Sequence, residues 1–168
     1  GAHYIIEAFQ RLDTTVKLVM AGDDPFEKKY IRSLHEMAAD NPNIIFPGYV
    51  TDDKFLELIT NARLFVLPSE IEGMPLGLLE SMSYGKCCVV SDIPENLEAL
   101  NGHGFIFRNR SVDDLTDVLE KVLADPSEAR IVGERARDYV LAEYSWDRIV
   151  DQYIDFYREV ITDFNKSR

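Results

Sequence analysis

The sequence has 168 residues with 46% hydrophobic and 29% charged residues, a composition typical of one globular domain. Thirty acidic against 18 basic residues leave a formal net charge of −12. This charge argues against a nucleic-acid-binding protein and against docking on anionic lipid, since both partners are themselves negative. No apolar run approaches the ~20 residues that a membrane-spanning helix needs.

The two cysteines, Cys87 and Cys88, are neighbours in an apolar run. Neighbours in a strand point to opposite faces, so we expect two core thiols rather than a disulfide or a metal pair. Free thiols suit a reducing compartment, and we therefore expect a cytoplasmic protein. The chain starts at Gly1, directly before an uncapped amphipathic helix pattern, so we expect it to be a fragment.

In chain order, helical patterns alternate with short apolar runs. After the helix that begins near Tyr4, the runs predict strands over residues 16–21, 43–46, 64–67, 87–91 and 105–107. These runs are apolar throughout rather than alternating, which is typical of strands buried on both faces. The sequence therefore predicts an α/β domain over residues 1–168, with one parallel sheet flanked by helices.

Capping residues predict where the intervening helices start. Residues 24–27, Asp-Pro-Phe-Glu, offer an N-cap followed by Pro at the first helical position. Thr51 or Asp52 is expected to cap the next helix. Further starts are expected at the Ser111-x-x-Asp114 box and at Asp125, which Pro126 follows.

The last predicted helix, over residues 145–164, carries an apolar surface wider than a single stripe. Two interpretations stay open: the helix packs on its own sheet, or its far half docks on something outside this chain. Under the second, we expect Trp146 to anchor its start on the domain. We then expect the helix to swing out, to fray after about Val160, or to pack on a second copy.

Ligands of open parallel sheets bind beyond the carboxyl ends of the strands. The loops there cover residues 22–24, 48–51, 68–75 and 91–95. In the third loop, Gly73 lets a ligand approach the backbone, and the helix that begins near Pro75 or Leu76 offers free N–H groups to an anion. Glu80, one turn further on, could accept hydrogen bonds from a ribose diol, and Glu72 from a second sugar. Either glutamate alone is better explained as a solvated surface residue.

The segment from Glu72 to Gly85, EGMPLGLLESMSYG, followed by VVSD, resembles the E-x7-E signature of the retaining family-4 glycosyltransferases (glycosyl transferases group 1). Other segments resemble the same family in order and spacing: VMAGD at 19–23, IFPGYV at 45–50, ARLFVLPS at 62–69 and YSW at 144–146. The resemblance covers nearly the whole chain. It implies a Rossmann-like domain, the C-terminal half of a GT-B fold, which binds the nucleotide-sugar donor.

The resemblance also implies roles for individual residues. Glu72 would be the catalytic residue, which holds donor-sugar hydroxyls near the reacting carbon, and Glu80 would bind the ribose. The remaining donor-binding residues would be Gly22, Gly48, Tyr49 and Val50, the last three against the base, and the backbone of Gly73, Met74, Pro75 and Leu76 against the sugar and diphosphate.

The expected donor is a UDP- or GDP-linked sugar, and the expected acceptor is a glycan or lipid-linked molecule. No cofactor or metal ion is expected, because the sequence has no D-x-D motif to hold a metal-bound diphosphate. The family's N-terminal acceptor domain, and a first strand with its Arg…Lys pair, would lie outside this chain. The chain alone is therefore expected to be inactive, with residues 145–164 crossing back to the missing half. That half could bring the enzyme to the inner face of the membrane.

Two further interpretations stay open. One is another GT-B enzyme, a sugar-phosphate synthase or a nucleotide-sugar epimerase. The other is a non-enzymatic flavodoxin-like binding module, such as a phospho-receiver. That module needs an Asp at a strand end with a Lys and a Thr at later strand ends. Asp92 ends a predicted strand, but the sequence offers no matching Lys and Thr pair.

Overall fold

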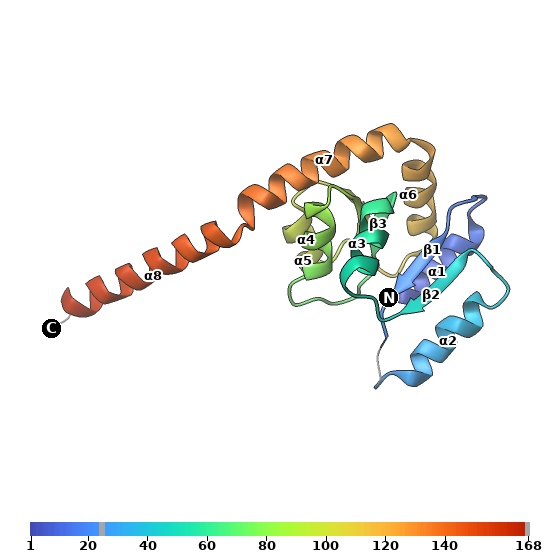
Figure 1. The fold of residues 1–168 in the computed structure, drawn as a ribbon, viewed down its shortest axis with the longest axis horizontal. Helices are drawn as coiled ribbons and strands as arrows, with labels where there is room; N and C mark the ends of the chain where they lie inside the picture. Colours follow the sequence, from blue (N-terminus) through green and yellow to red (C-terminus); the bar gives the residue numbers. More distant parts are fainter. Residues whose placement is uncertain (24–25, 167–168) are drawn as a thin grey trace.

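The computed structural model describes residues 1–23 and 26–166 (Figure 1). The elements in chain order are α1 (Ala2–Arg11), β1 (Leu18–Ala21), α2 (Lys28–Ala38), β2 (Ile44–Gly48), α3 (Asp52–Asn61), β3 (Leu64–Leu67), α4 (Leu76–Ser83), β4 (Cys87–Ser91), α5 (Pro94–Leu100), β5 (Phe105–Phe107), α6 (Val112–Ala124), α7 (Pro126–Glu143) and α8 (Trp146–Lys166). The predicted α/β class is confirmed. The strands over 64–67, 87–91 and 105–107 match their predicted bounds, whereas β1 starts two residues later and β2 ends two residues later than expected.

All strand pairs are parallel, but the sheet has two parts. β1 pairs with β2, with Leu18 opposite Ile44, and β4 pairs with both β3 and β5. In the described residues no ladder joins β1 to β3. The predicted parallel sheet flanked by helices is therefore confirmed, and in this chain it lies in two parts because β1 and β3 each have a neighbour on one side only.

Burial of the strands follows from this division. Every residue of β4 is buried between its two neighbours, as predicted. β3 is only half-buried along its length, and β1 alternates between half-buried and exposed. The expectation that all strands are buried on both faces is thus wrong for the strands with an open edge.

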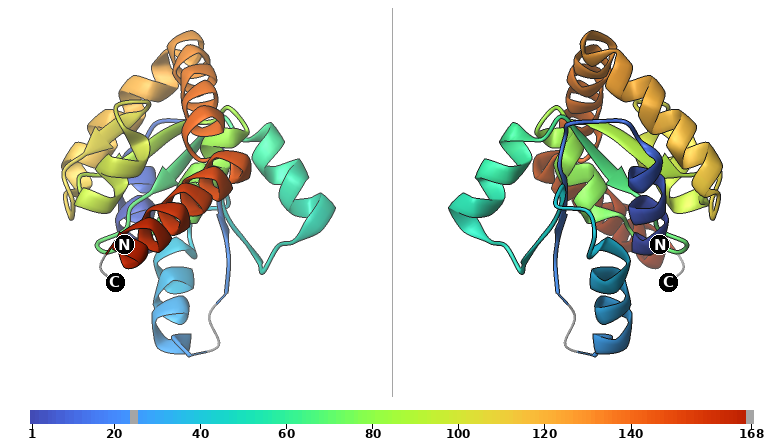
Figure 2. Two further views of the ribbon diagram at one scale, coloured as in Figure 1. Left: turned by 90° about the vertical axis from the view of Figure 1, so that its left-hand side faces the viewer. Right: turned by 90° about the vertical axis from the view of Figure 1, so that its right-hand side faces the viewer.

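Two layers of helices cover β4. On one face, Ile5 and Ala8 of α1 pack with Val89 and with Leu115 of α6, and partly buried Leu18 and Leu64 bring β1 and β3 into the same cluster. On the other face, α4, α5 and α7 pack against Cys88 and Val90. Figure 2 shows α2 and α3 projecting from two other sides of this body.

The adjacent cysteines are confirmed as buried, free core thiols on opposite faces of β4. Burial raises the pKa of the Cys87 thiol to about 11. Burial also raises the pKa of the Cys88 thiol, whose Sγ lies 3.3 Å from the Lys86 carbonyl.

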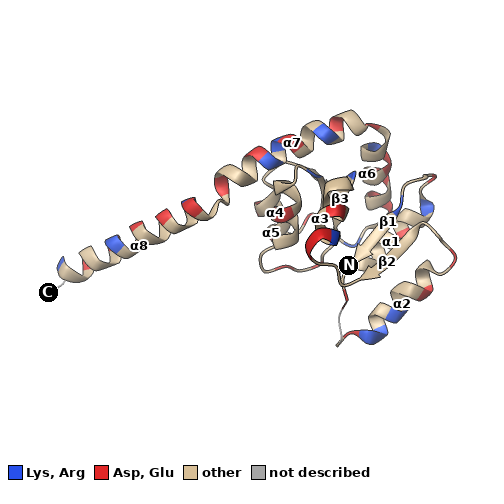
Figure 3. Cartoon of the chain, in the orientation of Figure 1, with Lys and Arg blue, Asp and Glu red and all other residues tan. Residues whose placement is uncertain are grey.

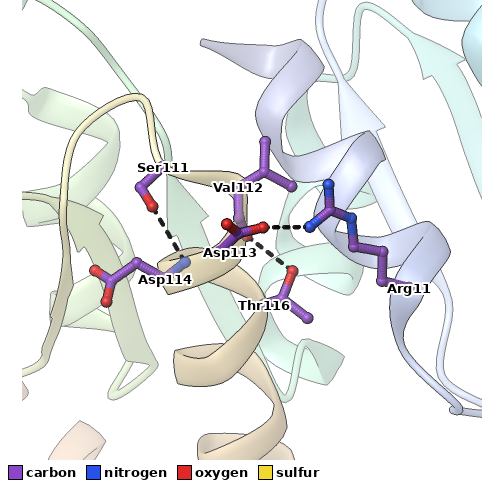
Figure 4. A network of polar contacts seen from close by, with 6 residues as sticks. All are labelled: Arg11, Ser111, Val112, Asp113, Asp114 and Thr116. Carbon is purple, nitrogen blue, oxygen red and sulfur yellow. Dashed lines mark hydrogen bonds and ion pairs between the residues drawn. The ribbon is translucent and has the colours of Figure 1, made fainter.

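Side-chain caps mark the starts of α6 and α7. Ser111 accepts a hydrogen bond from the Asp114 amide at 3.2 Å, and the neighbouring Asp113 pairs with Arg11 at 2.6 Å, which ties α6 to α1 (Figure 4). Asp125 caps α7 through two amides. Both caps confirm the sequence pattern. Thr51 is the N-cap of α3, although its side chain makes no capping hydrogen bond.

The predicted start of α2 is wrong. The helix begins at Lys28 with Glu27 as its N-cap, so Phe26 and Glu27 are not helical. The predicted cap itself, Asp24 and Pro25, lies outside the described residues.

α8 extends away from the domain as a continuation beyond α7 (Figure 1). None of its residues is buried: Tyr153, Tyr157 and Val160 are 60%, 59% and 49% exposed. The swung-out helix is therefore confirmed, and packing on its own sheet is excluded. The expected anchor is wrong, because Trp146 is 80% exposed. Of the three alternatives, the helix swings out and does not fray at Val160, since it runs on to Lys166.

Charged residues recur along the whole length of α8 (Figure 3). Arg158 pairs with Asp155 at 3.2 Å, and Lys166 pairs with Asp163 at 3.6 Å. α8 is thus amphipathic, with a solvated polar side and an uncovered apolar side. Among the described residues, no helix has both the length and the hydropathy to span a membrane.

Candidate functional site

The first turn of α1 connects the carboxyl edges of the two sheet parts. Tyr4 Oη donates a hydrogen bond to Glu70 Oε1 at 3.0 Å, just beyond β3. His3 Nδ1 lies 2.8 Å from Tyr30 Oη, in the first turn of the helix that follows β1. Because both contacts start from one helical turn, the carboxyl ends of β1 and β3 lie on the same side of the domain. The predicted ligand-binding loops therefore share one edge.

Hydrogen bonds between loops hold this edge together. The buried Ser91, at the end of β4, donates from Oγ to the Ser69 carbonyl after β3 at 2.5 Å. Asn96 of α5 in turn donates from Nδ2 to Ser91 Oγ at 3.0 Å. The Asn109 amide after β5 donates to Asp92 Oδ1 at 2.7 Å. The ends of β3, β4 and β5 are thus joined directly.

Glu72 lies in the loop after β3, where its carboxylate is half-buried. Ser69 Oγ donates to Glu72 Oε1 at 2.6 Å, which orients the carboxylate within the loop. Its neighbour Glu70 accepts the Tyr4 hydrogen bond on one oxygen, and its other oxygen lies 2.6 Å from the Arg110 guanidinium. The Tyr4 hydrogen bond and the positive charge of Arg110 hold the pKa of Glu70 below its usual range. Burial, together with the same hydrogen bond, raises the pKa of Tyr4.

The start of α4 differs from the predicted anion site in one respect. Pro75 is the N-cap with φ −77° and ψ 73°, an inverse γ-turn in which the Leu76 amide donates to the Met74 carbonyl at 2.8 Å. Leu78 and Leu79 both donate to the Pro75 carbonyl. The Leu76 N–H is thus already hydrogen-bonded in this structure, and the expected contact of the Leu76 backbone with the donor stays a prediction.

Gly77 replaces Leu76 as the amide that α4 can offer. Its N–H makes no hydrogen bond to any group in the part of the chain that the structure describes. The residue is exposed, and it lies in the first turn, where the helix dipole favours an anion. The first N–H groups of a helix have no partner within it, so the inverse γ-turn at Pro75 occupies the Leu76 amide and leaves that of Gly77 free.

The other residues of this corner lie where the sequence predicts. Gly73 and Met74 are exposed in the loop, while the Pro75 ring is buried. Glu80 is exposed on α4, about 6 Å along the axis from Leu76 at 1.5 Å per residue. Both glutamates thus follow β3 at the same edge, although their roles remain predictions.

Gly22 and Gly48 form a second corner at this edge. The Gly22 amide donates to the Gly48 carbonyl at 2.9 Å, and the two residues have φ values of +135° and +75°. These backbone conformations favour glycine at both positions. Tyr49 beside them is 80% exposed and Val50 is half-buried. The structure therefore brings Gly22 together with residues 48–50, as the predicted binding surface requires.

A cavity of about 290 Å³ lies at the opposite edge of the sheet, between the starts of β3 and β4 and the turn from α6 to α7. Lys86 lines it, and its Nζ donates to the carbonyls of Thr60 and Ala62 at 2.7 and 3.2 Å. These bonds close the end of α3, and burial lowers the pKa of Lys86. The cavity is thus explained by helix packing and is separate from the carboxyl-edge loops.

Comparison with known proteins agrees with this arrangement. Residues 1–139 match the family model described as glycosyl transferases group 1. The chain belongs to the glycosyl transferases group 1 family. The match includes every strand and both predicted glutamates, so the family is shown by the domain itself rather than by the arm formed by α8.

Curated relatives of this glycosyltransferase domain are longer proteins. N-acetyl-alpha-D-glucosaminyl L-malate synthase of Bacillus anthracis is 31% identical over 167 residues, which cover 95% of this chain and 42% of that protein. Alpha-maltose-1-phosphate synthase of Mycolicibacterium smegmatis is 26% identical, over 95% of this chain and 45% of that protein. The domain thus spans less than half the length of the relatives it matches.

Solved structures share its fold. Anabaena Alr3699/HepE, in complex with UDP and glucose, superposes with a TM-score of 0.87 at 19% identity, over 95% of this chain and 45% of that chain. Sucrose-phosphate synthase from Thermosynechococcus elongatus superposes with a TM-score of 0.84 at 23% identity, over 97% and 43%. The expected GT-B relationship is confirmed at the level of the fold.

Proposed function

We propose that this domain binds a UDP- or GDP-linked sugar as the donor half of a retaining glycosyltransferase. The enzyme would transfer a hexosyl unit to a glycan or lipid-linked acceptor. The main support is the corner after β3, where an oriented Glu72, a free Gly77 amide and an exposed Glu80 follow one another along the chain. A carboxylate, an anion-binding amide and a second carboxylate suit the sugar, diphosphate and ribose of one donor.

Each group has a distinct role in this proposal. The Gly77 N–H and the dipole of α4 stabilise the charge that grows on the leaving diphosphate. Glu72 holds donor-sugar hydroxyls and lies where positive charge develops on the sugar, which a carboxylate stabilises. Glu80 binds ribose, and residues 48–50 contact the base. No metal ion takes part, in keeping with the lack of a D-x-D motif.

The open edges of β1 and β3 support the proposal that a further strand belongs between them. In a doubly wound sheet with strand order 3-2-1-4-5-6, the first strand lies between the second and the fourth. If β1 and β2 are the second and third strands, and β3, β4 and β5 the fourth to sixth, the gap is the place of the first. We propose that residues preceding α1 in the larger protein supply it, with the cations that hold the diphosphate.

The length of the relatives and the uncovered apolar side of α8 support the proposal that a second half of the enzyme packs against this domain. This domain covers 42% of the Bacillus anthracis relative, so the rest of a protein of that length is long enough to contain an acceptor-binding half. The apolar side of α8 would pack against that half, which would complete the enzyme.

A sugar-phosphate synthase is the second candidate. Alpha-maltose-1-phosphate synthase and sucrose-phosphate synthase are both among the similar proteins. In that case the donor site is the same, and the acceptor carries a phosphate group.

Thermal denaturation of the chain with ligands tests the proposal. Ligands that bind the native state raise the melting temperature by mass action. We expect UDP or GDP at several millimolar to raise it and acetyl phosphate to leave it unchanged. The opposite pattern would support a phospho-receiver and overturn donor binding.

A further inference from the structure

Arg110 lies in the loop between β5 and α6, far in sequence from the motif that carries Glu72. We propose that Arg110 is a positioning residue of the donor site, which acts through Glu70 to hold the Glu72 loop in place. This inference rests on the proposed function of that loop and adds a residue that the sequence motif does not contain.

The ion pair between Arg110 and Glu70 is one half of a two-sided contact. The guanidinium lies 2.6 Å from Glu70 Oε2, while Tyr4 Oη donates to Glu70 Oε1 at 3.0 Å. The Glu70 side chain is 29% exposed between them. One carboxylate thus receives a donor from α1 and a cation from the loop after β5.

The loop that carries Arg110 is itself fixed. Arg110 has a φ of 63°, a left-handed conformation that is uncommon for a residue with a side chain. Next to it, the Asn109 amide donates to Asp92 Oδ1 at 2.7 Å, which joins this turn to the loop directly after β4. The guanidinium is therefore presented from a supported position rather than from a free loop.

Fixing Glu70 restrains Glu72, two residues further on. Ser69, on the other side of Glu70, accepts the Ser91 hydrogen bond on its carbonyl and donates its own hydroxyl to Glu72. The loop is thus held at Ser69 by β4 and at Glu70 by α1 and Arg110. Beyond these points it reaches the exposed Gly73 and Met74.

This arrangement predicts that losing the ion pair weakens contacts to the donor sugar rather than contacts to the nucleoside. The restrained loop carries the groups proposed to contact the sugar, whereas Glu80 and residues 48–50, proposed for ribose and base, lie on other elements. Releasing the loop should weaken binding of a nucleotide sugar more than binding of the nucleotide alone.

Two variants separate positioning from simple electrostatics. Arg110→Ala removes the ion pair but leaves Glu70 as an unpaired anion near an anionic donor. Glu70→Gln removes the ion pair together with that negative charge. Positioning predicts that both variants lose preference for the nucleotide sugar, whereas charge repulsion predicts opposite effects on donor binding.

Arg108→Ala is the matched control. Arg108 is exposed in the same loop, and its side chain forms no ion pair within residues 1–23 and 26–166. The Arg108→Ala substitution changes the net charge by the same amount as Arg110→Ala.

The first measurement is amide hydrogen exchange of residues 70–74 in the chain. Exposed ion pairs contribute modestly, so we expect exchange to become roughly two- to fivefold faster in Arg110→Ala and Glu70→Gln. Exchange in Arg108→Ala should match the unaltered chain. Unchanged exchange in Arg110→Ala would overturn the proposal.

The second measurement compares UDP-glucose or GDP-mannose with UDP or GDP by ligand-observed NMR. We expect both variants to lose about two- to fivefold in affinity for the nucleotide sugar, with nucleotide affinity unchanged. Faster exchange with unaltered sugar preference would overturn positioning but leave the donor function intact. If no nucleotide binds the unaltered chain, the proposed function fails, and the inference fails with it.

Discussion

Ser69 and Glu72 are three residues apart in the loop after β3, and the Ser69 hydroxyl donates to the Glu72 carboxylate at 2.6 Å. The Ser69 carbonyl is held by the buried Ser91 at the end of β4. The orientation of Glu72 therefore depends on β4 as well as on its own loop.

Substitution of the two glutamates should separate chemistry from binding. In the complete enzyme, we expect Glu72→Gln to lower kcat about 100-fold, because it removes a charge next to the reacting carbon. Glu80→Gln should raise the donor KM about tenfold with kcat nearly unchanged, because ribose contacts are similar in the ground and transition states. Steady-state kinetics with varied donor checks both. Equal effects of the two changes on kcat would contradict this division.

The free amide of Gly77 can be removed without removing a side chain. Gly77→Pro deletes the N–H in the first turn of α4, where proline is tolerated, and should raise the donor KM about tenfold. Gly77→Ala is the control, because it keeps the N–H and its Cβ would lie 3.7 Å from Phe65, an ordinary contact. Similar kinetics for both variants would show that this amide does not bind the diphosphate.

The chain by itself should bind UDP or GDP weakly, with a Kd in the millimolar range or above. Such a complex has a free energy of only about 4 kcal/mol. The net charge of −12 opposes an anionic ligand, and the proposed diphosphate cations lie outside the chain. Titration calorimetry at two salt concentrations checks this. Tight binding that is insensitive to salt would be inconsistent with it.

The apolar side of α8 should make the isolated chain self-associate. Tyr153, Tyr157 and Phe164 are each more than half exposed, and an aromatic side chain can bury about 150–250 Å². Together they form a patch of the size that usually finds a partner. Sedimentation equilibrium should show oligomers that Tyr153→Lys with Tyr157→Lys dissociates. The pair Asp151→Lys and Asp155→Lys, on the polar side, should leave them intact.

The buried thiols should make stability fall at high pH. Below pH about 9 both states hold the Cys87 proton, whereas above it the unfolded state releases a proton that the native state keeps up to about pH 11. Stability is therefore complete below the unfolded pKa and declines as pH rises, by about 1.4 kcal/mol per pH unit for one thiol. Denaturant midpoints from pH 8 to 10.5 should fall less steeply for Cys87→Ala than for the unaltered chain.

Sequence patterns predicted the elements well where local chemistry decides them. The side chains of Ser111 and Asp125 cap α6 and α7 as expected, because a cap depends on two or three neighbouring residues. The start of α2 was predicted too early. Residues 24–27 have the composition of a helix start, but the helix begins at Lys28.

For the site, residue types and spacing alone placed Glu72, Gly73 and Glu80 in order along one strand–loop–helix unit. The same segment also resembled the signature of a known family. The tertiary structure decided that Leu76 is not a free donor and Gly77 is, because backbone dihedrals at Pro75 close a turn that composition does not encode. It also brought Tyr4 and Arg110, 66 and 40 residues away from Glu70, to one carboxylate. Such contacts depend on how helices and strands pack. The same packing leaves the apolar side of α8 with no surface of this chain to pack against among the described residues.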